Sequence, residues 1–314
     1  MRTLRELWRF SRPHTIIGTT LSLLALYLMA RGMFRPPVAG AFADAHASVK
    51  PGITTAALLL TWLSCITANV YIVGLNQLTD IGLDRINKPY LPLASGAWSV
   101  RTGRFVVWTC FGVSLLLTAL VGSTWLWWTV GASLLLGTAY SLPPFRLKRF
   151  NFWAAFCIIA VRSLIVNILL FAHVADWRAP LTDLPPLVWL LVFVMFAFSV
   201  AIAWFKDLPD DEGDAAFGVE TLTVKLGKRQ VLRQGTAVLT LALAVAIVGP
   251  WLSGRFGGAG IFLAVPHAIV LAAFLSRARS VDLDSANSIR RFYLGLWALF
   301  FAEYGIFALA AWFL

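Results

Sequence analysis

Charged side chains are scarce in this sequence. Only 13% of its 314 residues are Asp, Glu, Lys or Arg, whereas 59% are hydrophobic. A soluble globular domain has about 25% charged and about 45–50% apolar residues. The shortage of charge therefore excludes a soluble globular fold and favours a bilayer environment. The formal net charge of +11 does not indicate nucleic-acid binding, because the basic residues are divided among short segments between apolar runs.

Cysteine and histidine are also scarce. The three cysteines, Cys65, Cys110 and Cys157, stand singly inside apolar runs, and the four histidines are scattered. The absence of a CxxC pair or a Cys/His cluster excludes a disulfide framework and a zinc site. All three cysteines are expected to be small buried hydrophobic residues.

Long apolar runs dominate what remains, and about 20 apolar residues span a bilayer as a helix. The sequence predicts an all-α, polytopic membrane protein with nine transmembrane helices in one bundle or barrel, forming a single domain over residues 1–314. The basic N-terminal segment precedes the first span and is not a signal peptide, because further spans follow it. The nine predicted spans are 15–30, 53–75, 105–121, 124–142, 152–174, 187–205, 231–252, 258–275 and 292–314.

The basic residues indicate the orientation, because Lys and Arg concentrate in cytoplasmic loops. With a cytoplasmic N-terminus and nine spans, most of the 26 basic residues fall on the cytoplasmic side. Arg162 lies inside a span. The opposite side receives only Arg31, Arg35, Lys50, Arg178 and Arg255.

Nearly half of the 15 acidic residues lie in two short stretches that both follow even-numbered spans and so face the cytoplasm. In the first stretch Asn76, Asp80 and Asp84 are spaced i, i+4, i+8, which places them on one face of a helix. Two like charges on one stripe favour a divalent cation between them, and Mg²⁺ binds carboxylates together with substrate phosphates. Arg85 and Lys88 follow at once and can bind the same phosphates.

The second stretch contains five acidic residues among mainly basic cytoplasmic loops, and it predicts a second metal site. Asp207/Asp211 and Asp210/Asp214 are both i, i+4 pairs, and the sequence does not decide which pair points inward. Pro209 and Gly213 indicate an irregular helix here. The stretch runs Lys206-Asp207-Leu208-Pro209-Asp210-Asp211-Glu212-Gly213-Asp214.

These two stretches on a nine-span protein resemble the UbiA-type intramembrane prenyltransferases. Within that superfamily, the segments 76–96, 140–148, 161–167 and 205–224 are similar to the homogentisate branch. Tyr90-Leu91-Pro92-Leu93 stands where other branches often have Arg-Pro. Ser163 departs from the glycine common in this branch.

The resemblance implies transfer of a phytyl or geranylgeranyl group from a prenyl diphosphate to homogentisate. Diphosphate and CO₂ are lost, as in tocopherol and prenylquinone biosynthesis. It implies Mg²⁺ bound by Asn76, Asp80, Asp84, Asp207, Asp210, Asp211 and Asp214, of which Asp80, Asp84, Asp207 and Asp211 are expected to be catalytic. The expected diphosphate-binding residues are Asn76, Arg85, Lys88, Arg146, Lys148 and Lys206.

Arg162 is the predicted partner of the anionic acceptor, since an ionisable residue inside a membrane is a functional candidate. Asn167, Tyr71 and Tyr140 complete the expected acceptor and cation site, because aromatic faces stabilise cations. Two alternatives stay open: a superfamily relative with another aromatic acceptor or a polar-lipid product, and an ion-coupled transporter. The lack of a long transit peptide favours a bacterial inner membrane over a plastid precursor, with a thylakoid membrane also possible.

Overall fold

The computed structural model describes residues 2–34, 52–208 and 221–314, and every regular element in these ranges is a helix. Side-chain caps begin several of the helices: Thr54, Ser99, Ser123 and Ser285 each accept a hydrogen bond from a backbone N–H in the first turn. Such caps satisfy N–H groups that have no partner within the helix. The α-helices are α1 (Arg2–Phe10), α2 (Pro13–Met33), α3 (Thr55–Thr79), α4 (Ile81–Asn87), α5 (Val100–Val121), α6 (Thr124–Ser141), α7 (Asn151–Ile159), α8 (Phe171–Val174), α9 (Pro186–Phe205), α11 (Leu222–Leu226), α12 (Lys228–Leu252), α13 (Ile261–Ser280) and α14 (Ala286–Ala310).

Shorter elements connect these helices. A π-helix, η2 (Ala160–Leu170), joins α7 to α8 without a break. Three 3₁₀ turns complete the described chain, namely η1 (Leu147–Arg149), η3 (Leu181–Asp183) and η4 (Gly257–Gly260).

Eight of the helical segments are long and apolar enough to cross a membrane. They correspond to eight of the nine predicted spans, which confirms the all-helical membrane fold. The remaining predicted span, 124–142, is helix α6, whose 18 residues include Trp125, Trp127, Trp128 and several Ser and Thr. These residues keep the mean hydropathy of α6 below that of the eight spans, and the count of nine stays a prediction.

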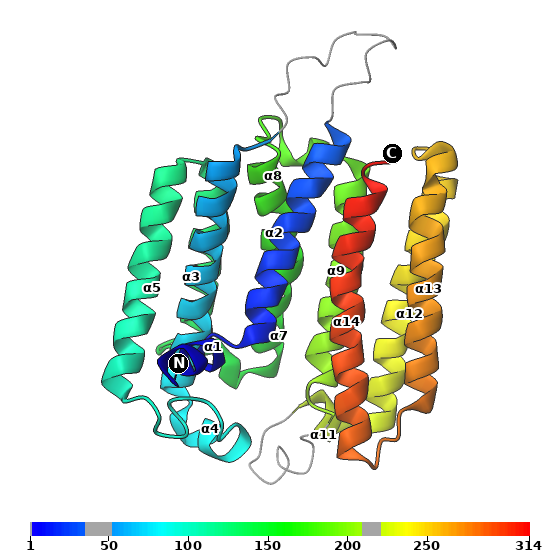
Figure 1. Cartoon of the computed structure of the whole chain (residues 1–314). Coiled ribbons are helices and arrows are strands. Elements are labelled where there is room, and N and C mark those ends of the chain that lie inside the picture. Colours follow the sequence, from blue (N-terminus) through cyan, green and yellow to red (C-terminus); the bar gives the residue numbers. More distant parts are fainter. Residues whose placement is uncertain (1, 35–51, 209–220) are drawn as a thin grey trace. The chain divides into compact units, whose positions relative to one another are not determined.

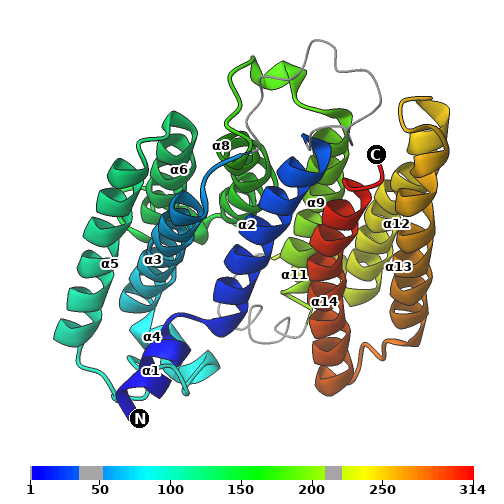
Figure 2. The same ribbon diagram turned by 45° about the horizontal axis from the view of Figure 1, so that its top comes forward.

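The described chain forms two compact units, each with its own core. Unit 1 comprises residues 1–24, 53–157 and 172–177, and its most extensive helix packing is between α3 and α5. Figures 1 and 2 both show α3 and α5 side by side, with α1 and α4 near the end where α3 stops. The polar Ser64 side chain is fully buried here and bonds to the Ser114 carbonyl and the Thr118 hydroxyl. Polar groups between spans therefore bond to each other rather than face lipid.

Unit 2 comprises residues 25–52, 158–171 and 178–314, and its described part packs α9 against η2, α12 and α14. Helix α9 is the most buried span.

Of the three cysteines, only Cys157 is buried, whereas Cys65 and Cys110 are partly exposed. The prediction of three buried cysteines is therefore wrong for these two, which lie on helices whose outer faces are available to lipid.

Gly235 lies in a close contact between α12 and α9 in unit 2, because a Cβ there would lie 2.3 Å from the Phe205 ring. Phe205 is fully buried and packs on Phe292, so it has little room to move. We expect Gly235→Ala to lower the free energy of unfolding by about 1–3 kcal/mol through overpacking. A drop in Tm of the detergent-purified protein measures this effect. Gly305→Ala is the matched control, because no atom lies within 4 Å of its added Cβ, and equal Tm values for the two variants would contradict the expectation.

Candidate active site

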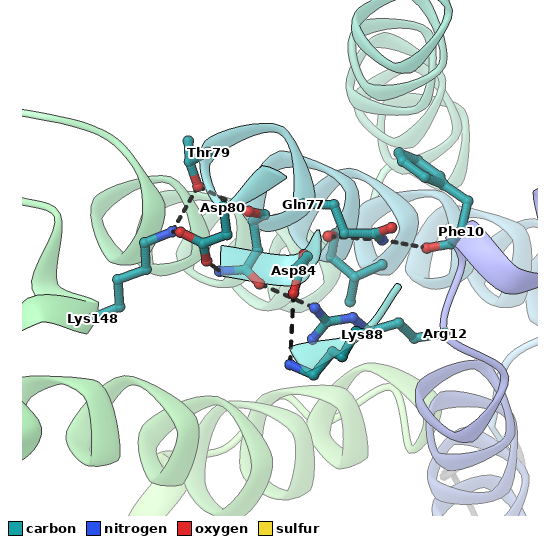
Figure 3. A network of polar contacts seen from close by, with 10 residues as sticks. Phe10, Arg12, Gln77, Thr79, Asp80, Asp84, Lys88 and Lys148 are labelled. Carbon is teal, nitrogen blue, oxygen red and sulfur yellow. Dashed lines mark hydrogen bonds and ion pairs between the residues drawn. The ribbon is translucent and has the colours of Figure 1, made fainter. Parts of the chain in front are cut away.

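The first acidic stretch lies where α3 ends and α4 begins. Helix α3 stops at Thr79, and Asp80 sits between the helices with φ −120° and ψ 18°. The expected continuous helix through Asn76, Asp80 and Asp84 is therefore wrong at Asp80, where the backbone leaves helical geometry. Contact within the stretch persists, because Asn76 Nδ2 donates a 3.1 Å hydrogen bond to Asp80 Oδ2. Figure 3 shows Asp80 and Asp84 at this junction, with Lys148 and Lys88 beside them.

Asp80 is surrounded by basic residues from the turn after α6. Lys148 Nζ donates 2.6 Å hydrogen bonds to Asp80 Oδ1 and to the Thr79 hydroxyl. Arg146 Nη2 lies 3.7 Å from the same carboxylate oxygen. Burial lowers the pKa of Lys148, while the bond to Asp80 opposes that shift. Both predicted diphosphate-binding residues of this turn thus lie at the acidic stretch.

Asp84 is the most buried member of the stretch, with 4% of its surface exposed. Desolvation raises the pKa of its carboxyl, and the positive charges of Lys88 and Arg12 oppose that rise. Lys88 Nζ lies 3.8 Å from Asp84 Oδ1, whereas Asp84 Oδ2 is buried without a hydrogen-bond partner. A buried carboxylate oxygen without a donor is costly unless a further positive group binds it. Arg85, which follows, is exposed.

Arg12 is a site residue that the sequence analysis missed. Its Nη2 donates a 3.2 Å hydrogen bond to Asn76 Oδ1, and its charge acts on Asp84. Arg12 and Arg146 both have positive φ, at 52° and 37°. Left-handed backbone costs a non-glycine residue roughly 1–2 kcal/mol, and such outliers concentrate at functional sites. The only signal in the sequence is that Arg12 is a basic residue just before the first span. The other arginines of that segment indicate only which side of the membrane it lies on.

The donor set of this stretch fits Mg²⁺. Mg²⁺ is bound in proteins by one or two carboxylates, with waters and substrate phosphates completing its shell. Asp80 and Asp84 supply two carboxylates and Asn76 an amide oxygen, and the orphaned Asp84 Oδ2 is available to a cation. Two carboxylates and an amide oxygen leave coordination positions for waters and phosphate oxygens. Over the described ranges no cluster of three or more His, Cys, Asp or Glu residues forms.

The second stretch begins at the end of α9 in unit 2. Lys206 Nζ lies 3.9 Å from Asp207 Oδ1, and both side chains are partly exposed. Asp210, Asp211 and Asp214 lie outside the described residues, since 209–220 are not among them.

Arg162 lies in the π-helical segment η2, and its guanidinium sits 4.5 Å from the centre of the Trp297 ring. Asn167 Nδ2 donates to the backbone carbonyls of Arg162 and Ser163, and Tyr304 donates to Asn167 Oδ1. π-bulges occur frequently at functional sites. The wide turn is held by side-chain bonds, which fixes where the Arg162 side chain leaves the helix.

Tyr293 connects this group to the second acidic stretch. Its hydroxyl interacts electrostatically with both Arg162 and Asp207. Unit 2 therefore brings a cation, two aromatic rings and the first acid of the second stretch into one neighbourhood. Trp297 and Tyr293 were not singled out from the sequence, because nothing marks them among so many aromatic residues.

The two tyrosines chosen from the sequence differ in environment. Tyr71 is buried between α3, α5 and α6, where its hydroxyl bonds to Thr138 and its ring contacts Trp108 and Phe111. These contacts occupy the ring with neighbouring aromatic groups. Tyr140 is partly exposed in the last turn of α6, close in sequence to the Arg146–Lys148 turn. A role for either ring in stabilising a cation stays a prediction.

A family model of the UbiA prenyltransferase family matches residues 33–304. The chain belongs to the UbiA prenyltransferase family. It is 46% identical to the homogentisate phytyltransferase of Synechocystis sp., over 99% of this chain and 97% of that protein. It is 37% identical to the homogentisate geranylgeranyltransferase of Triticum aestivum, over 96% of this chain and 72% of that protein. This UbiA-family membrane protein is therefore a prenyltransferase, and the transporter alternative is dropped.

A solved structure shows the same fold. A UbiA homolog from Archaeoglobus fulgidus, bound to GPP and Mg²⁺, is similar with a TM-score of 0.60 at 19% identity. The similarity covers 98% of this chain and 99% of that chain. The UbiA fold predicted from the two acidic stretches is thereby confirmed.

Proposed function

We propose that this enzyme transfers a prenyl group from a prenyl diphosphate to homogentisate, with loss of diphosphate and CO₂, in tocopherol or prenylquinone biosynthesis. The observation that carries the proposal is the 46% identity, over 99% of the chain, to a homogentisate phytyltransferase. Phytyl and geranylgeranyl diphosphates are the expected donors. The reaction takes place at the cytoplasmic face of a bacterial inner or thylakoid membrane, within a single domain.

The acidic stretches bind the donor diphosphate through Mg²⁺ in this proposal. Asn76, Asp80 and Asp84 hold the metal in unit 1, and Asp207, Asp210, Asp211 and Asp214 are the proposed ligands of the second stretch. When bound, Mg²⁺ supplies positive charge that offsets the negative charge developing on the leaving diphosphate. The orphaned oxygen of Asp84 supports the assignment in unit 1.

The protein's own cations have two tasks at the diphosphate. Lys148 and Arg146 hold the Asp80 carboxylate in place, as their distances of 2.6 and 3.7 Å indicate. Arg85 is exposed and Lys88, beside Asp84, is partly exposed, and both contact phosphate oxygens that arrive from water. Lys206 has the corresponding position beside Asp207. Fixed positive groups at the site of developing charge lower the barrier without reorganising.

The acceptor is bound in unit 2. Arg162 binds the acetate carboxylate of homogentisate, and Asn167 fixes the wide helical turn that carries it. Trp297 covers the guanidinium and presents an aromatic surface in the same neighbourhood as Tyr293. Aromatic faces stabilise the allylic cation formed when the C–O bond of the donor breaks, and the apolar surroundings keep water from that cation.

A panel of acceptors tests this function. The purified protein is incubated with Mg²⁺ and either phytyl or geranylgeranyl diphosphate, and diphosphate release is measured with homogentisate and with other aromatic acids. Of the acceptors, only homogentisate is expected to give fast release of diphosphate. Preference for another aromatic acid would support the alternative of a different acceptor, and no release from the folded protein with any acceptor would contradict prenyl transfer.

Lys148→Met gives a second expected result. Loss of the 2.6 Å bond frees the Asp80 carboxylate and removes a charge from the diphosphate site. A hydrogen bond to a charged group contributes about 1.5–3 kcal/mol, so we expect the KM for the donor to rise roughly 10- to 100-fold. Steady-state kinetics with varied donor measure it. Arg149→Met is the matched control, because Arg149 is the exposed neighbour, and similar losses in both variants would contradict a specific role.

A further inference from the structure

Helix α1 has an exposed apolar face that no described part of the chain covers. Leu4, Leu7 and Trp8 are spaced i, i+3, i+4 and are 72%, 39% and 50% exposed. Residues at this spacing form one stripe on a helix. Exposing two leucines and a tryptophan to water is unfavourable, so we expect another apolar surface to cover this stripe.

The other faces of α1 have different surroundings. Glu6 and Phe10 are 8% and 0% exposed and face unit 1, while Arg5 is exposed and Arg9 pairs with Glu6 at 3.3 Å. Arg5 and Arg9 are four residues apart and lie on a side that neither the leucines nor Phe10 occupies. Helix α1 thus has one face toward protein, one apolar face and one basic face.

The end of α1 is fixed to unit 1. Gln77 Nε2 donates a 2.7 Å hydrogen bond to the Phe10 carbonyl, and the Phe10 ring packs 5.0 Å from that of Trp98. Phe10 fits here because a Cβ at Gly74 would come within 2.7 Å of its ring. The orientation of the exposed stripe is therefore set by packing.

The next helix sets the position of α1 relative to the membrane. Only Ser11 and Arg12 separate α1 from α2, which begins at Pro13 and is long and apolar enough to cross the membrane. Figure 1 shows α1 nearly end-on, whereas the first part of α2 runs upright in the same view, so α1 runs across the direction of α2. A helix that crosses a span at its very end lies in the plane of the membrane surface.

We propose that α1 is an interfacial helix that binds a lipid surface with anionic headgroups. Leu4, Leu7 and Trp8 enter the boundary of the acyl chains, and Arg5 and Arg9 face the headgroups. Helices with Leu and Trp on one side and basic residues on the other lie in this position. Anionic lipid is the occupant that complements both the apolar stripe and the arginines, and Arg12 then enters the Asn76–Asp84 site directly from a membrane-bound helix.

Depth-dependent quenching tests this placement. The full chain, with its three cysteines replaced by serine, receives Leu4→Cys or Arg5→Cys and a fluorophore, and is placed in lipid nanodiscs. Lipid-borne nitroxide is expected to quench the label at position 4 strongly. Aqueous iodide is expected to quench the label at position 4 several-fold less than the label at position 5. Equal iodide access at the two positions would overturn lipid insertion. Protection of position 4 from both quenchers would overturn it too and indicate a protein occupant.

Lipid selectivity is tested with the nitroxide on either phosphatidylglycerol or phosphatidylcholine at equal bulk fraction. A basic residue at an anionic surface contributes about fivefold in affinity, so the anionic quencher should act more strongly at position 4. Arg5→Glu should reduce the difference, whereas Arg101→Glu, an exposed charge at the start of α5, should not. Equal quenching by the two lipids would contradict the anionic preference.

Discussion

Asp80→Asn is expected to lower the rate of prenyl transfer by at least about 10²-fold, the usual loss when one fixed electrostatic group of an active site is removed. The substitution keeps the shape of the side chain but removes the charge that Lys148 and Arg146 approach. Without that charge the two cations repel each other and a bound Mg²⁺, and the stretch retains a single carboxylate at Asp84. The concentration of Mg²⁺ needed for half-maximal rate should therefore rise together with the loss of rate.

The control for this variant is Asp183→Asn. Asp183 is an exposed carboxylate in η3, outside both acidic stretches. It should leave the rate and the Mg²⁺ requirement unchanged. If Asp80→Asn retained the full rate at the same Mg²⁺ concentration, the assignment of this stretch as the metal site would be wrong. Tm measurements on both variants separate loss of chemistry from loss of fold.

Arg162→Met should raise the KM for homogentisate about 10- to 100-fold, because a hydrogen bond to a charged group contributes about 1.5–3 kcal/mol. Methionine keeps the length and apolar contact with Trp297 but cannot bind a carboxylate. The KM for the prenyl diphosphate should change little, since the proposed donor residues lie in the acidic stretches. Arg162→Lys should recover only part of the affinity, because a lysine does not present the planar, two-pronged donor of an arginine.

A neutral acceptor distinguishes the two possible roles of Arg162. If Arg162 binds the acetate arm, a hydroquinone without that arm should be prenylated with similar KM by the wild-type protein and by Arg162→Met. If Arg162 only supports the packing of η2 against α14, both acceptors should lose equally. The second outcome would contradict a binding role and leave Arg162 as a structural partner of Trp297.

The fold could be predicted from sequence largely because apolar spans leave a strong signal. Runs of about 20 apolar residues and the charge pattern in their loops are local properties. Helix α6 shows the limit of that signal, since its tryptophans and hydroxyl residues keep its mean hydropathy below that of the other eight spans. Local patterns also gave the acidic stretch at Asn76, Asp80 and Asp84, and the Lys148 and Arg146 that approach Asp80.

Features that depend on tertiary contact could not be predicted. The helix break at Asp80 and the π-helix around Arg162 are held by long-range bonds, such as Lys148 to Asp80 and Tyr304 to Asn167. Arg12 belongs to the site because the turn after α1 carries it to Asn76. Trp297 is a site residue because of where α14 packs, and its sequence neighbours, which include Tyr293 and Phe300, resemble it too closely to distinguish it.

Homogentisate labelled with ¹³C in its carboxyl carbon provides the most direct measurement. The purified protein is given Mg²⁺, the labelled acceptor and phytyl or geranylgeranyl diphosphate, and product and gas are analysed by mass spectrometry. The proposed function predicts a prenylated quinol without the label, labelled CO₂ in equal amount, and neither product after EDTA or in Asp80→Asn. A prenylated product that keeps the labelled carboxyl, or a folded protein that makes no prenylated product from homogentisate, would contradict it.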